Sequence, residues 1–443
     1  SRDNPKRDWY VWRDGQDDGP PNNWISIFGG SAWELDPHTG QYYYHAFLKE
    51  QPDLNWRNPA VKQAMWEMVR FWLDMGVDGF RLDAIGTIYE HPNLPDHPLG
   101  RPTDNLVDVH ELSRDEYDQL MLYQKQQPGL HELMKELRAL VDEYPGDRVL
   151  VGEDEDVAFH GSGDDELHLV FNFPLMRVDR LTPEHIRTNQ ALRLSELPPE
   201  AWPCNTLGNH DTPRSWDRYG DGVHDAELAR LHIALMLTLK GTPFLYNGEE
   251  IGMSNLILER LEQLRDTAAT ARYERLVQQG GRSPAEALEI AIHTTRDRCR
   301  SPMQWNATPN AGFSSAEVQT WLPVHENYAQ GVNVAAQQND PNSLLSFYKQ
   351  LLQLRRNTPA LIAGDYHALH AHSDAYYAFL RYDEDSGQRC LVVLNFTAET
   401  QTIIFDLPQQ RPQLLFSSAN RTAETLTLEL LKLAPFEIFI AAL

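Results

Sequence analysis

Hydrophobic positions in the middle of the chain alternate between a helical period and short continuous apolar runs. The first helix is expected to start at Pro59, which Asn58 can cap, and to end at Gly76. Its apolar stripe consists of Val61, Met65, Met68, Val69 and Trp72. The apolar run at residues 77–83 then predicts a strand.

The same unit of helix and strand repeats further along the chain. A second helix carries Leu130, Leu133, Met134, Leu137, Leu140 and Val141 on one face. Further strands are predicted at residues 148–152, 169–173, 204–208 and 243–246, and further helices from about residue 226 and at 344–354. This alternation is typical of a parallel sheet wrapped by helices, so an α/β architecture is expected.

Three further segments of the chain do not follow this alternation of helix and strand. Residues 1–50 are rich in Trp, Tyr, Gly, Pro and Asn with little periodicity, which indicates a loop-rich excursion rather than a core. Two helices are predicted at 256–279 and 283–292, the second opened by Ser283 and Glu286 in capping-box spacing. Beyond Gly364, short aromatic and β-branched runs predict a small antiparallel β domain.

Composition narrows the class of protein. The 443 residues carry a formal net charge of −25 and contain no apolar run long enough to span a bilayer. The electrostatic field of this negative charge repels phosphate backbones and anionic lipid. We therefore expect a small neutral ligand, and neither nucleic acid nor membrane, as partner. Three cysteines, Cys204, Cys299 and Cys390, are few and odd in number, which favours a reducing, cytoplasmic compartment over a disulfide framework. Oligomeric state is left open.

Charged side chains follow the predicted strands. Arg81 and Asp83 are two residues apart and are therefore expected on the same side of the first strand, where a structural ion pair is the simpler interpretation. Glu153 follows the strand 148–152, and His210 and Asp211 follow the strand 204–208. In parallel barrels the chemistry gathers at the C-terminal ends of strands, so these acids are expected to converge. A solvated acidic loop at Glu153 and a histidine satisfied by Asp211 are the alternatives.

Seven short segments together give a specific resemblance. GFRLDA at 79–84, VGE at 151–153 and NHD at 209–211 resemble, in order and strand context, three motifs of the alpha-amylase superfamily, glycoside hydrolase family 13. Four further segments resemble motifs of the α-glucosidase and oligo-1,6-glucosidase branch of this superfamily. They are FGGSAW at 28–33, QPDLNW at 51–56, NGEEIGM at 247–253 and RSPMQW at 300–305.

The resemblance implies a (β/α)8 TIM barrel with a C-terminal antiparallel β domain. Residues 1–50 would be a subdomain inserted after barrel strand 3, residues 51–363 the barrel from strand 4 to strand 8 with a helical insertion at 254–293, and residues 364–443 the β domain. The family's first motif and first three strands have no counterpart here. The chain, which opens at Ser1 without Met, is therefore expected to be the later part of a larger protein.

The resemblance also implies roles for individual residues. Asp83 would be the nucleophile and Glu153 the general acid/base, while Asp211 would steady the distorted sugar. The physical logic agrees, because Arg81 would keep Asp83 ionised and carboxylates such as Asp211 would raise the pKa of Glu153. Sugar contacts are further implied for His210 and Arg300, and for Phe28 and Phe173, although the last two could equally be core residues.

The expected function is a retaining, exo-acting α-glucosidase. No cofactor is needed for that chemistry, and a structural calcium ion would belong to the preceding segment. Ala84, which follows Asp83, favours maltose-type α-1,4 linkages over α-1,6 linkages. A trehalose synthase or another glucosyl-transferring isomerase is the nearest alternative, because a sugar can intercept the covalent intermediate. A non-catalytic binding subunit is the alternative from another class, although Asp83, Glu153 and Asp211 are all present.

Overall fold

The structure is a computed structural model that describes residues 1–99, 112–407, 411–419, 421 and 427–443. Two compact units make up the chain. Unit 1 consists of residues 1–170, 198–201 and 258–295, and unit 2 consists of residues 171–197, 202–257 and 296–443.

The N-terminal part of unit 1 is a small antiparallel sheet, in which β3 (Gln41–Tyr44) pairs with both β1 (Trp12–Arg13) and β2 (Trp33–Asp36). The sheet covers a core of Val11, Trp24, Ala32, Trp33, Tyr44 and Ala46. The expectation of an excursion without a core is therefore wrong in this region. Strands of two to four residues leave no periodic signal in the sequence, and contacts such as the Trp24 indole with the Pro95 carbonyl, at 2.7 Å, join distant segments.

Helix α1 (Pro59–Asp74) begins where the sequence predicts, because the Asn58 side chain accepts a hydrogen bond of 2.9 Å from the Ala60 N–H. Its buried positions are Val61, Val69 and Leu73. The predicted stripe is therefore partly wrong, since Met68 and Trp72 are 39% and 42% exposed and Leu73 is buried instead. Positions spaced by four from Val61 to Leu73 share one side of a 3.6-residue helix, and Trp72 lies off that line.

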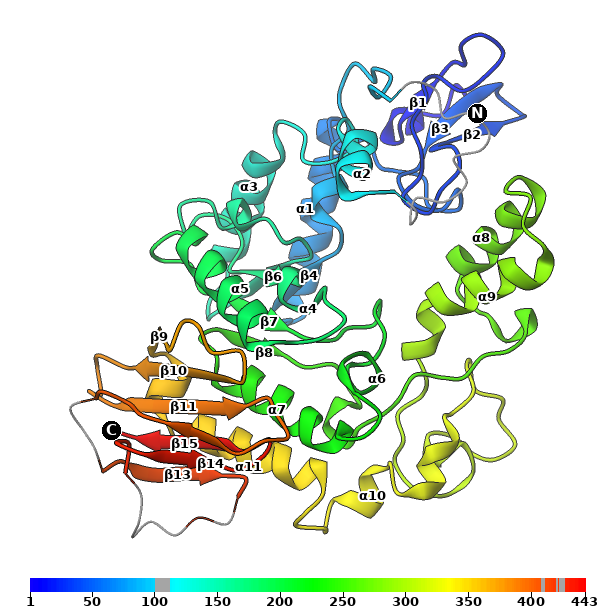
Figure 1. Ribbon diagram of the computed structural model, residues 1–443. Helices are drawn as coiled ribbons and strands as arrows, with labels where there is room; N and C mark the ends of the chain where they lie inside the picture. Colours follow the sequence, from blue (N-terminus) through cyan, green and yellow to red (C-terminus); the bar gives the residue numbers. More distant parts are fainter. Residues whose placement is uncertain (100–111, 408–410, 420, 422–426) are drawn as a thin grey trace. The chain divides into compact units, whose positions relative to one another are not determined.

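After α1, unit 1 continues with parallel strands and helices (Figure 1). These elements are β4 (Gly79–Leu82), α2 (Arg114–Met121), α3 (Leu130–Asp142), β5 (Val149–Gly152) and the start of β6 (Leu169–Asn172). Strand β5 pairs in parallel with β4 and with β6. Helix α3 buries all six residues of its predicted face, which pack with Leu150 and Val170 of the strands. The predicted strands are confirmed within two residues at each end.

The helical segment of unit 1 contains η6 (Leu261–Gln263), α8 (Thr267–Gln278) and α9 (Pro284–Thr294). The helix predicted from residue 256 starts later, because Asp266 caps α8 by accepting from the Ala268 N–H at 3.1 Å. The start of α9 is confirmed, with Ser283 and Glu286 in a reciprocal capping box.

Unit 2 continues the parallel pairing from the end of β6 through β7 (Cys204–Thr206) to β8 (Thr242–Phe244). Its helices are α4 (Phe173–Met176), α5 (Pro183–Glu196), α6 (Ser215–Tyr219), α7 (Asp225–Thr238), α10 (Val334–Gln337), α11 (Leu344–Arg356) and α12 (Pro359–Ile362). Helix α7 is buried over eight consecutive residues from Leu231 to Thr238, which places it at the centre of the unit's core.

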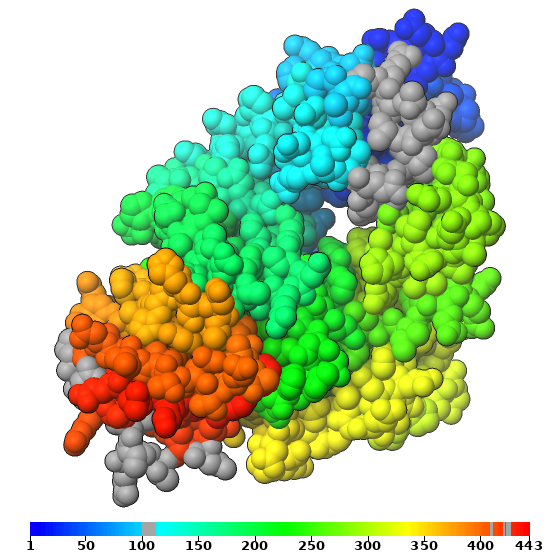
Figure 2. Space-filling model, viewed as in Figure 1, coloured from blue at the N-terminus to red at the C-terminus, as the bar shows by residue number. Residues whose placement is uncertain are grey.

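The C-terminal β domain belongs to unit 2. Its main antiparallel sheet has the order β13 (Gln413–Ser417), β15 (Ile438–Ala442), β11 (Arg389–Asn395), β10 (Tyr376–Tyr382), β9 (Asp365–Leu369), and β12 (Gln401–Ile403) pairs with β14 (Leu431–Leu433). Alternate residues face two cores. Phe379 and Val392 pack with residues of α7 and α11, whereas Ala378 and Val393 pack with β12 and β14. Figure 2 shows the orange and red surface of this domain directly beside a green part of the surface of unit 2. The prediction of antiparallel β structure here is confirmed.

No helix in the described part of the chain is both long and apolar enough to cross a membrane.

Candidate active site

Strands β4 and β5 end beside each other and bring three charged side chains of unit 1 together. Leu82 and Gly152 are register partners, so Asp83 and Glu153, the residues that follow them, leave the sheet side by side. Arg81 forms an ion pair with Asp83 through Nη1 and with Glu153 Oε1 through Nη2, the latter at 2.8 Å. One guanidinium therefore bridges both carboxyl groups.

The environments of the two carboxyl groups differ. The Asp83 side chain is 76% exposed and the Glu153 side chain is 19% exposed. Burial raises the pKa of Glu153 above its usual value, and a hydrogen bond with Asp83 and the charge of Asp83 raise it further, against the opposing effects of the Ala84 N–H and of Arg81. From the sequence, the raised pKa of Glu153 is expected to come from carboxylates such as Asp211. The structure assigns it first to burial and then to Asp83.

A turn at Ala84 connects the two strand ends. Ala84 has φ 43° and ψ 45°, a left-handed conformation that residues with a side chain rarely adopt. In this conformation its N–H donates to Glu153 Oε2 at 3.0 Å, while the Glu153 N–H donates to the Leu82 carbonyl at 2.8 Å. The 3-10 helix η2 (Ile85–Thr87) follows. Sequence reasoning missed this contact, because an alanine gives no signal for a left-handed turn.

In unit 2, the segment after β7 carries His210 and Asp211, and Arg300 holds both. The Arg300 guanidinium donates from Nε to the His210 carbonyl at 2.7 Å and from Nη2 to Asp211 Oδ1. His210 Nε2 lies 3.4 Å from Asp211 Oδ2. About a third of the Asp211 and Arg300 side chains is exposed, so the carboxylate keeps access to a ligand.

A second arginine at Asp211 was not predicted. Arg296 Nη1 lies 3.4 Å from Asp211 Oδ1. Arg296 opens the 3-10 helix η7 (Arg296–Cys299), and Arg300 follows it directly, so one turn places both side chains beside the same carboxylate. The spacing of four residues between Arg296 and Arg300 was the signal in the sequence that could have predicted this second arginine. The thiol of Cys299 also donates to the His210 carbonyl, at 3.3 Å.

The two candidate aromatic contacts lie in different surroundings. Phe173, at the start of α4 in unit 2, stacks on Phe171 with centroids 5.2 Å apart and an interplanar angle of 12°. Phe28, in unit 1, contacts Phe47 at 5.8 Å. Both side chains are half-buried, so their surroundings leave open both a core role and a sugar contact.

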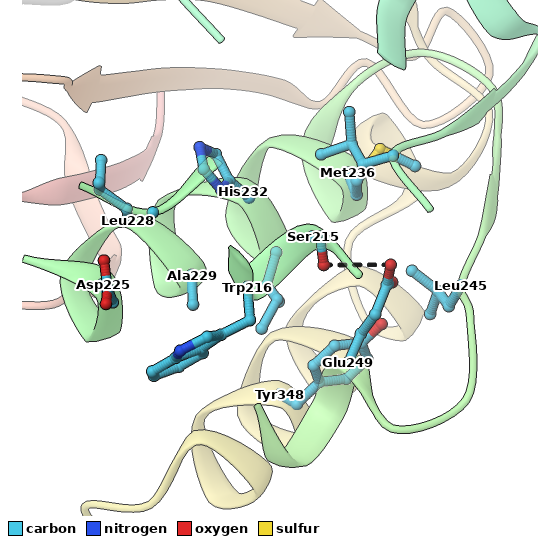
Figure 3. A pocket seen from close by; sticks show the side chains of 13 residues that line it. Ser215, Trp216, Asp225, Leu228, Ala229, His232, Met236, Leu245, Glu249 and Tyr348 are labelled. Carbon is cyan, nitrogen blue, oxygen red and sulfur yellow. Dashed lines mark hydrogen bonds between the residues drawn. The ribbon is translucent and has the colours of Figure 1, made fainter. Parts of the chain in front are cut away.

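Figure 3 shows a small cavity of unit 2, of about 30 Å³, which Glu249 lines together with Ser215, Trp216, His232 and Tyr348. Glu249 lies in the 3-10 helix η5 (Glu249–Ile251) and accepts from Ser215 Oγ and from the Tyr246 N–H, each at 3.2 Å. Burial raises the pKa of Glu249 to about 7. This volume holds about two water molecules and is far too small for a sugar ring, so the cavity is no substrate pocket.

Within the described residues, no group of three or more His, Cys, Asp or Glu side chains is arranged to hold a metal ion.

Comparison with known proteins identifies the family. Residues 1–364 match the catalytic domain of alpha-amylase. Over 460 aligned residues the chain is 36% identical to the oligo-1,6-glucosidase of Parageobacillus thermoglucosidasius, covering 99% of this chain and 78% of that enzyme. A probable alpha-glucosidase of Rhizobium meliloti (strain 1021) is 37% identical over 93% of this chain and 71% of its own length.

Two solved structures are similar over the whole chain. The trehalulose synthase of Pseudomonas mesoacidophila MX-45 has a TM-score of 0.86 at 34% identity, covering 100% of this chain and 79% of that one. A mutant isomaltulose synthase of Erwinia rhapontici NX5 has a TM-score of 0.86 at 32% identity, covering 100% of this chain and 78% of its own.

The chain belongs to the alpha-amylase family, glycoside hydrolase family 13, and its fold is the family's (β/α)8 barrel with a C-terminal antiparallel β domain. It is a glycoside hydrolase, and the chemistry of this family needs no cofactor. The resemblance drawn from the sequence motifs and the predicted fold class are thus confirmed.

Proposed function

We propose that this glycoside hydrolase is a retaining, exo-acting α-glucosidase that removes terminal α-linked glucose from short oligosaccharides, with maltose-type α-1,4 linkages preferred. The observation that carries the proposal is the asymmetry of the carboxyl pair under Arg81. Asp83 is exposed and paired with the guanidinium, whereas Glu153 is largely buried with a raised pKa. A retaining glycosidase needs one ionised and one protonated carboxyl group of this kind.

The reaction proceeds in two displacements. An oxygen of Asp83 attacks the anomeric carbon while Glu153 gives its proton to the departing glycosidic oxygen, so that the glycosidic bond breaks and a glucosyl ester forms. Glu153, now ionised, then takes a proton from water, and the water oxygen displaces Asp83 from the anomeric carbon. Asp83 and Glu153 hydrogen-bond to each other in this structure, and 76% of the Asp83 side chain is exposed to solvent.

Asp211 is proposed to stabilise the positive charge that develops on the sugar ring, with His210 and Arg300 binding the sugar hydroxyls. Arg296 and Arg300 hold the Asp211 carboxylate from its Oδ1 side, which fixes its orientation before substrate arrives. A fixed carboxylate stabilises the transition state without the cost of reorganising water.

A product assay with the chromogenic substrate 4-nitrophenyl α-glucopyranoside tests the proposal. Early ¹H NMR spectra are expected to show α-glucose before mutarotation, and initial release of β-glucose would exclude a retaining mechanism. The slow substrate 5-fluoro-α-glucosyl fluoride loses its anomeric fluoride to the nucleophile, so it is expected to add one 5-fluoroglucosyl mass to the wild type and none to Asp83→Asn. The matched control is Asp118→Asn, an exposed aspartate paired with Arg114, which should label as the wild type does.

A glucosyl-transferring isomerase is the second candidate. The similarity to a trehalulose synthase and an isomaltulose synthase, at TM-scores of 0.86, favours it. Such an isomerase and a hydrolase differ in the molecule that intercepts the covalent intermediate. In the isomerase a sugar hydroxyl reacts in place of water. Incubation with sucrose, and separately with maltose, followed by chromatography separates the candidates. Free monosaccharides support hydrolysis, whereas rearranged disaccharides support the isomerase.

A further inference from the structure

The segment that holds Asp211 is a short turn of unit 2. It consists of the 3-10 helix η7 (Arg296–Cys299) and Arg300, and we call it the arginine turn. The end of a helix leaves backbone carbonyls without a partner in the helix. Here the last three carbonyls each accept a hydrogen bond from another segment, and the first of them, the Arg298 carbonyl, accepts from the Leu256 N–H at 2.8 Å. Tertiary contacts therefore set the position of the arginine turn.

Two aromatic side chains hold the other two carbonyls. The Tyr246 hydroxyl donates to the Cys299 carbonyl at 3.0 Å. The Trp321 indole N–H donates to the Arg300 carbonyl, also at 3.0 Å. Tyr246 follows the end of β8, whereas Trp321 lies 21 residues beyond Arg300 in the chain. Two separate segments of unit 2 therefore fix consecutive peptide units of the arginine turn.

Neighbouring side chains fix both donors. The Arg214 guanidinium lies over the Tyr246 ring, 5.1 Å from its centroid, and donates to the Asn247 carbonyl at 2.9 Å. Arg214 is 1% exposed, so close packing holds it in place. Trp321 packs edge to face against Phe313, with ring centroids 5.0 Å apart. Each donor therefore belongs to a ring that has little freedom to move.

The arginine turn brings two guanidinium groups to one oxygen of Asp211. Arg300 Nη2 donates to Asp211 Oδ1, and Arg296 Nη1 lies 3.4 Å from the same atom. The Cys299 thiol, between them in the sequence, donates to the His210 carbonyl at 3.3 Å. A shift of the turn would displace the contacts of both arginines at once. Groups that stabilise a transition state must be held within about 0.5 Å of their productive position, so such a shift would impair catalysis.

We propose that Tyr246 and Trp321 are positioning residues, which hold the arginine turn by its carbonyls and thereby fix the Asp211 carboxylate. The proposal rests on the proposed α-glucosidase function, in which Asp211 stabilises the positive charge that develops on the sugar ring. Neither aromatic side chain contacts substrate in this role. Their effect reaches the reaction through Arg296 and Arg300, which orient Asp211 before a sugar binds.

The test removes each donor while keeping an aromatic ring. Tyr246→Phe and Trp321→Phe are each expected to lower kcat for maltose about fivefold, the effect of losing one hydrogen bond. The loss should be equal for α-glucosyl fluoride, because positive charge develops on the sugar ring with either leaving group. In an Arg300→Ala background most of the loss should disappear, since both residues act through the arginine turn. An undiminished loss in that background would overturn the proposal.

The matched control is Tyr376→Phe in the C-terminal β domain. The Tyr376 side chain is half-buried, as Tyr246 is, and its hydroxyl forms a hydrogen bond of 2.7 Å with His370 Nδ1. This variant should lower the Tm by a similar amount and leave kcat for both substrates unchanged. An equal loss of kcat in Tyr376→Phe would show that reduced stability explains the losses in the other variants, and would overturn the proposal.

Calorimetric titration with two ligands separates this proposal from the proposed function. The iminosugar 1-deoxynojirimycin carries a protonated ring nitrogen that resembles the charge of the transition state, whereas glucose is neutral. Tyr246→Phe and Trp321→Phe should each bind the iminosugar about fivefold more weakly, with a smaller effect on glucose. This result supports the proposal even if the wild type hydrolyses no α-glucoside, in which case the proposed function fails alone.

Three other outcomes of the titration would overturn the proposal. Unchanged binding of 1-deoxynojirimycin in both variants, beside hydrolysis of maltose by the wild type, overturns the proposal alone. Equal losses for the iminosugar and glucose would show a general disturbance of the site rather than a displaced carboxylate. A wild type that does not bind 1-deoxynojirimycin would show that Asp211 is not held to face a positive charge.

Discussion

The backbone N–H of Ala84 donates a hydrogen bond of 3.0 Å to Oε2 of Glu153. The residue that follows one carboxylate of the candidate site is thus tied to the other carboxylate. Since Arg81 binds the opposite oxygen, Oε1, at 2.8 Å, both oxygens of Glu153 are held by groups that belong to β4 or to its end. The position of Glu153 is therefore set by the neighbouring strand as much as by its own.

Replacing Glu153 by Gln should remove the proton donor while keeping the shape of the side chain. We expect kcat for maltose to fall by about 10² to 10⁴ and kcat for α-glucosyl fluoride to fall much less, because fluoride leaves without protonation. The raised pKa of Glu153 keeps the acid form to higher pH, so wild-type activity should decline as pH rises through that pKa. This alkaline limb should be absent from Glu153→Gln. Glu143→Gln, at an exposed ion pair with Arg70, is the control. Equal losses on both substrates would argue against a proton-donating role.

Ala84→Val tests the left-handed turn. A β-branched side chain at φ 43° is strained, so the free energy of unfolding should fall by about 1–3 kcal/mol in urea titrations. Ala84→Gly, which tolerates this conformation, should be at least as stable as the wild type. Equal stability of the Val and Gly variants would contradict the assigned turn.

Arg300→Lys should separate charge from geometry at Asp211. A single ammonium group cannot reproduce the two hydrogen bonds that the guanidinium gives to the His210 carbonyl and to Asp211. We expect kcat/KM for maltose to fall at least about tenfold with the fold retained by circular dichroism. Arg114→Lys, at an exposed pair with Asp118, should keep full activity. Unchanged kcat/KM in Arg300→Lys would mean that charge alone suffices.

Glu249 should make stability depend on pH. Its pKa is about 7 in the folded protein and 4.5 in the reference state, because burial outweighs the help of Ser215, the Tyr246 N–H and Arg214. Between these values the native state holds a proton that the unfolded state has released, so stability falls as pH rises from about 4.5 to 7.

The contribution of Glu249 to the free energy of unfolding falls by about 3 kcal/mol between pH 4.5 and 7. His232, which lines the same cavity, has its pKa lowered from 6.5 to about 3 by burial, so its imidazole is neutral in the native state between pH 4.5 and 7. The unfolded state binds a proton on this imidazole below about pH 6.5, so the contribution of His232 to stability rises with pH, opposite in sign to that of Glu249. As pH rises from about 5 to 7, the Tm of Glu249→Gln should therefore change in a more positive direction than the Tm of the wild type, because the falling contribution of Glu249 is removed. A parallel curve would show that Glu249 is ionised in the native state.

Much of the fold could be predicted from the sequence. The buried face of helix α3 could be predicted residue by residue, because its six apolar positions repeat at a helical period and all face one core. The strands β4 to β8 were predicted within two residues, because each is a short apolar run between a helix and a polar loop. The N-terminal aromatic core escaped prediction, since its strands are too short for any period to show.

The sequence by itself determined which residues are candidates for the chemistry. Asp83, Glu153 and Asp211 could be named because strand ends and motif spacing are local properties, and the identity of each side chain sets what it can do. Tertiary structure alone decided how those side chains are tuned. The burial of Glu153, the left-handed turn at Ala84 and the second arginine on Asp211 all depend on contacts between residues far apart in the chain. Burial and through-space charge are properties of packing, which no local pattern in the sequence encodes.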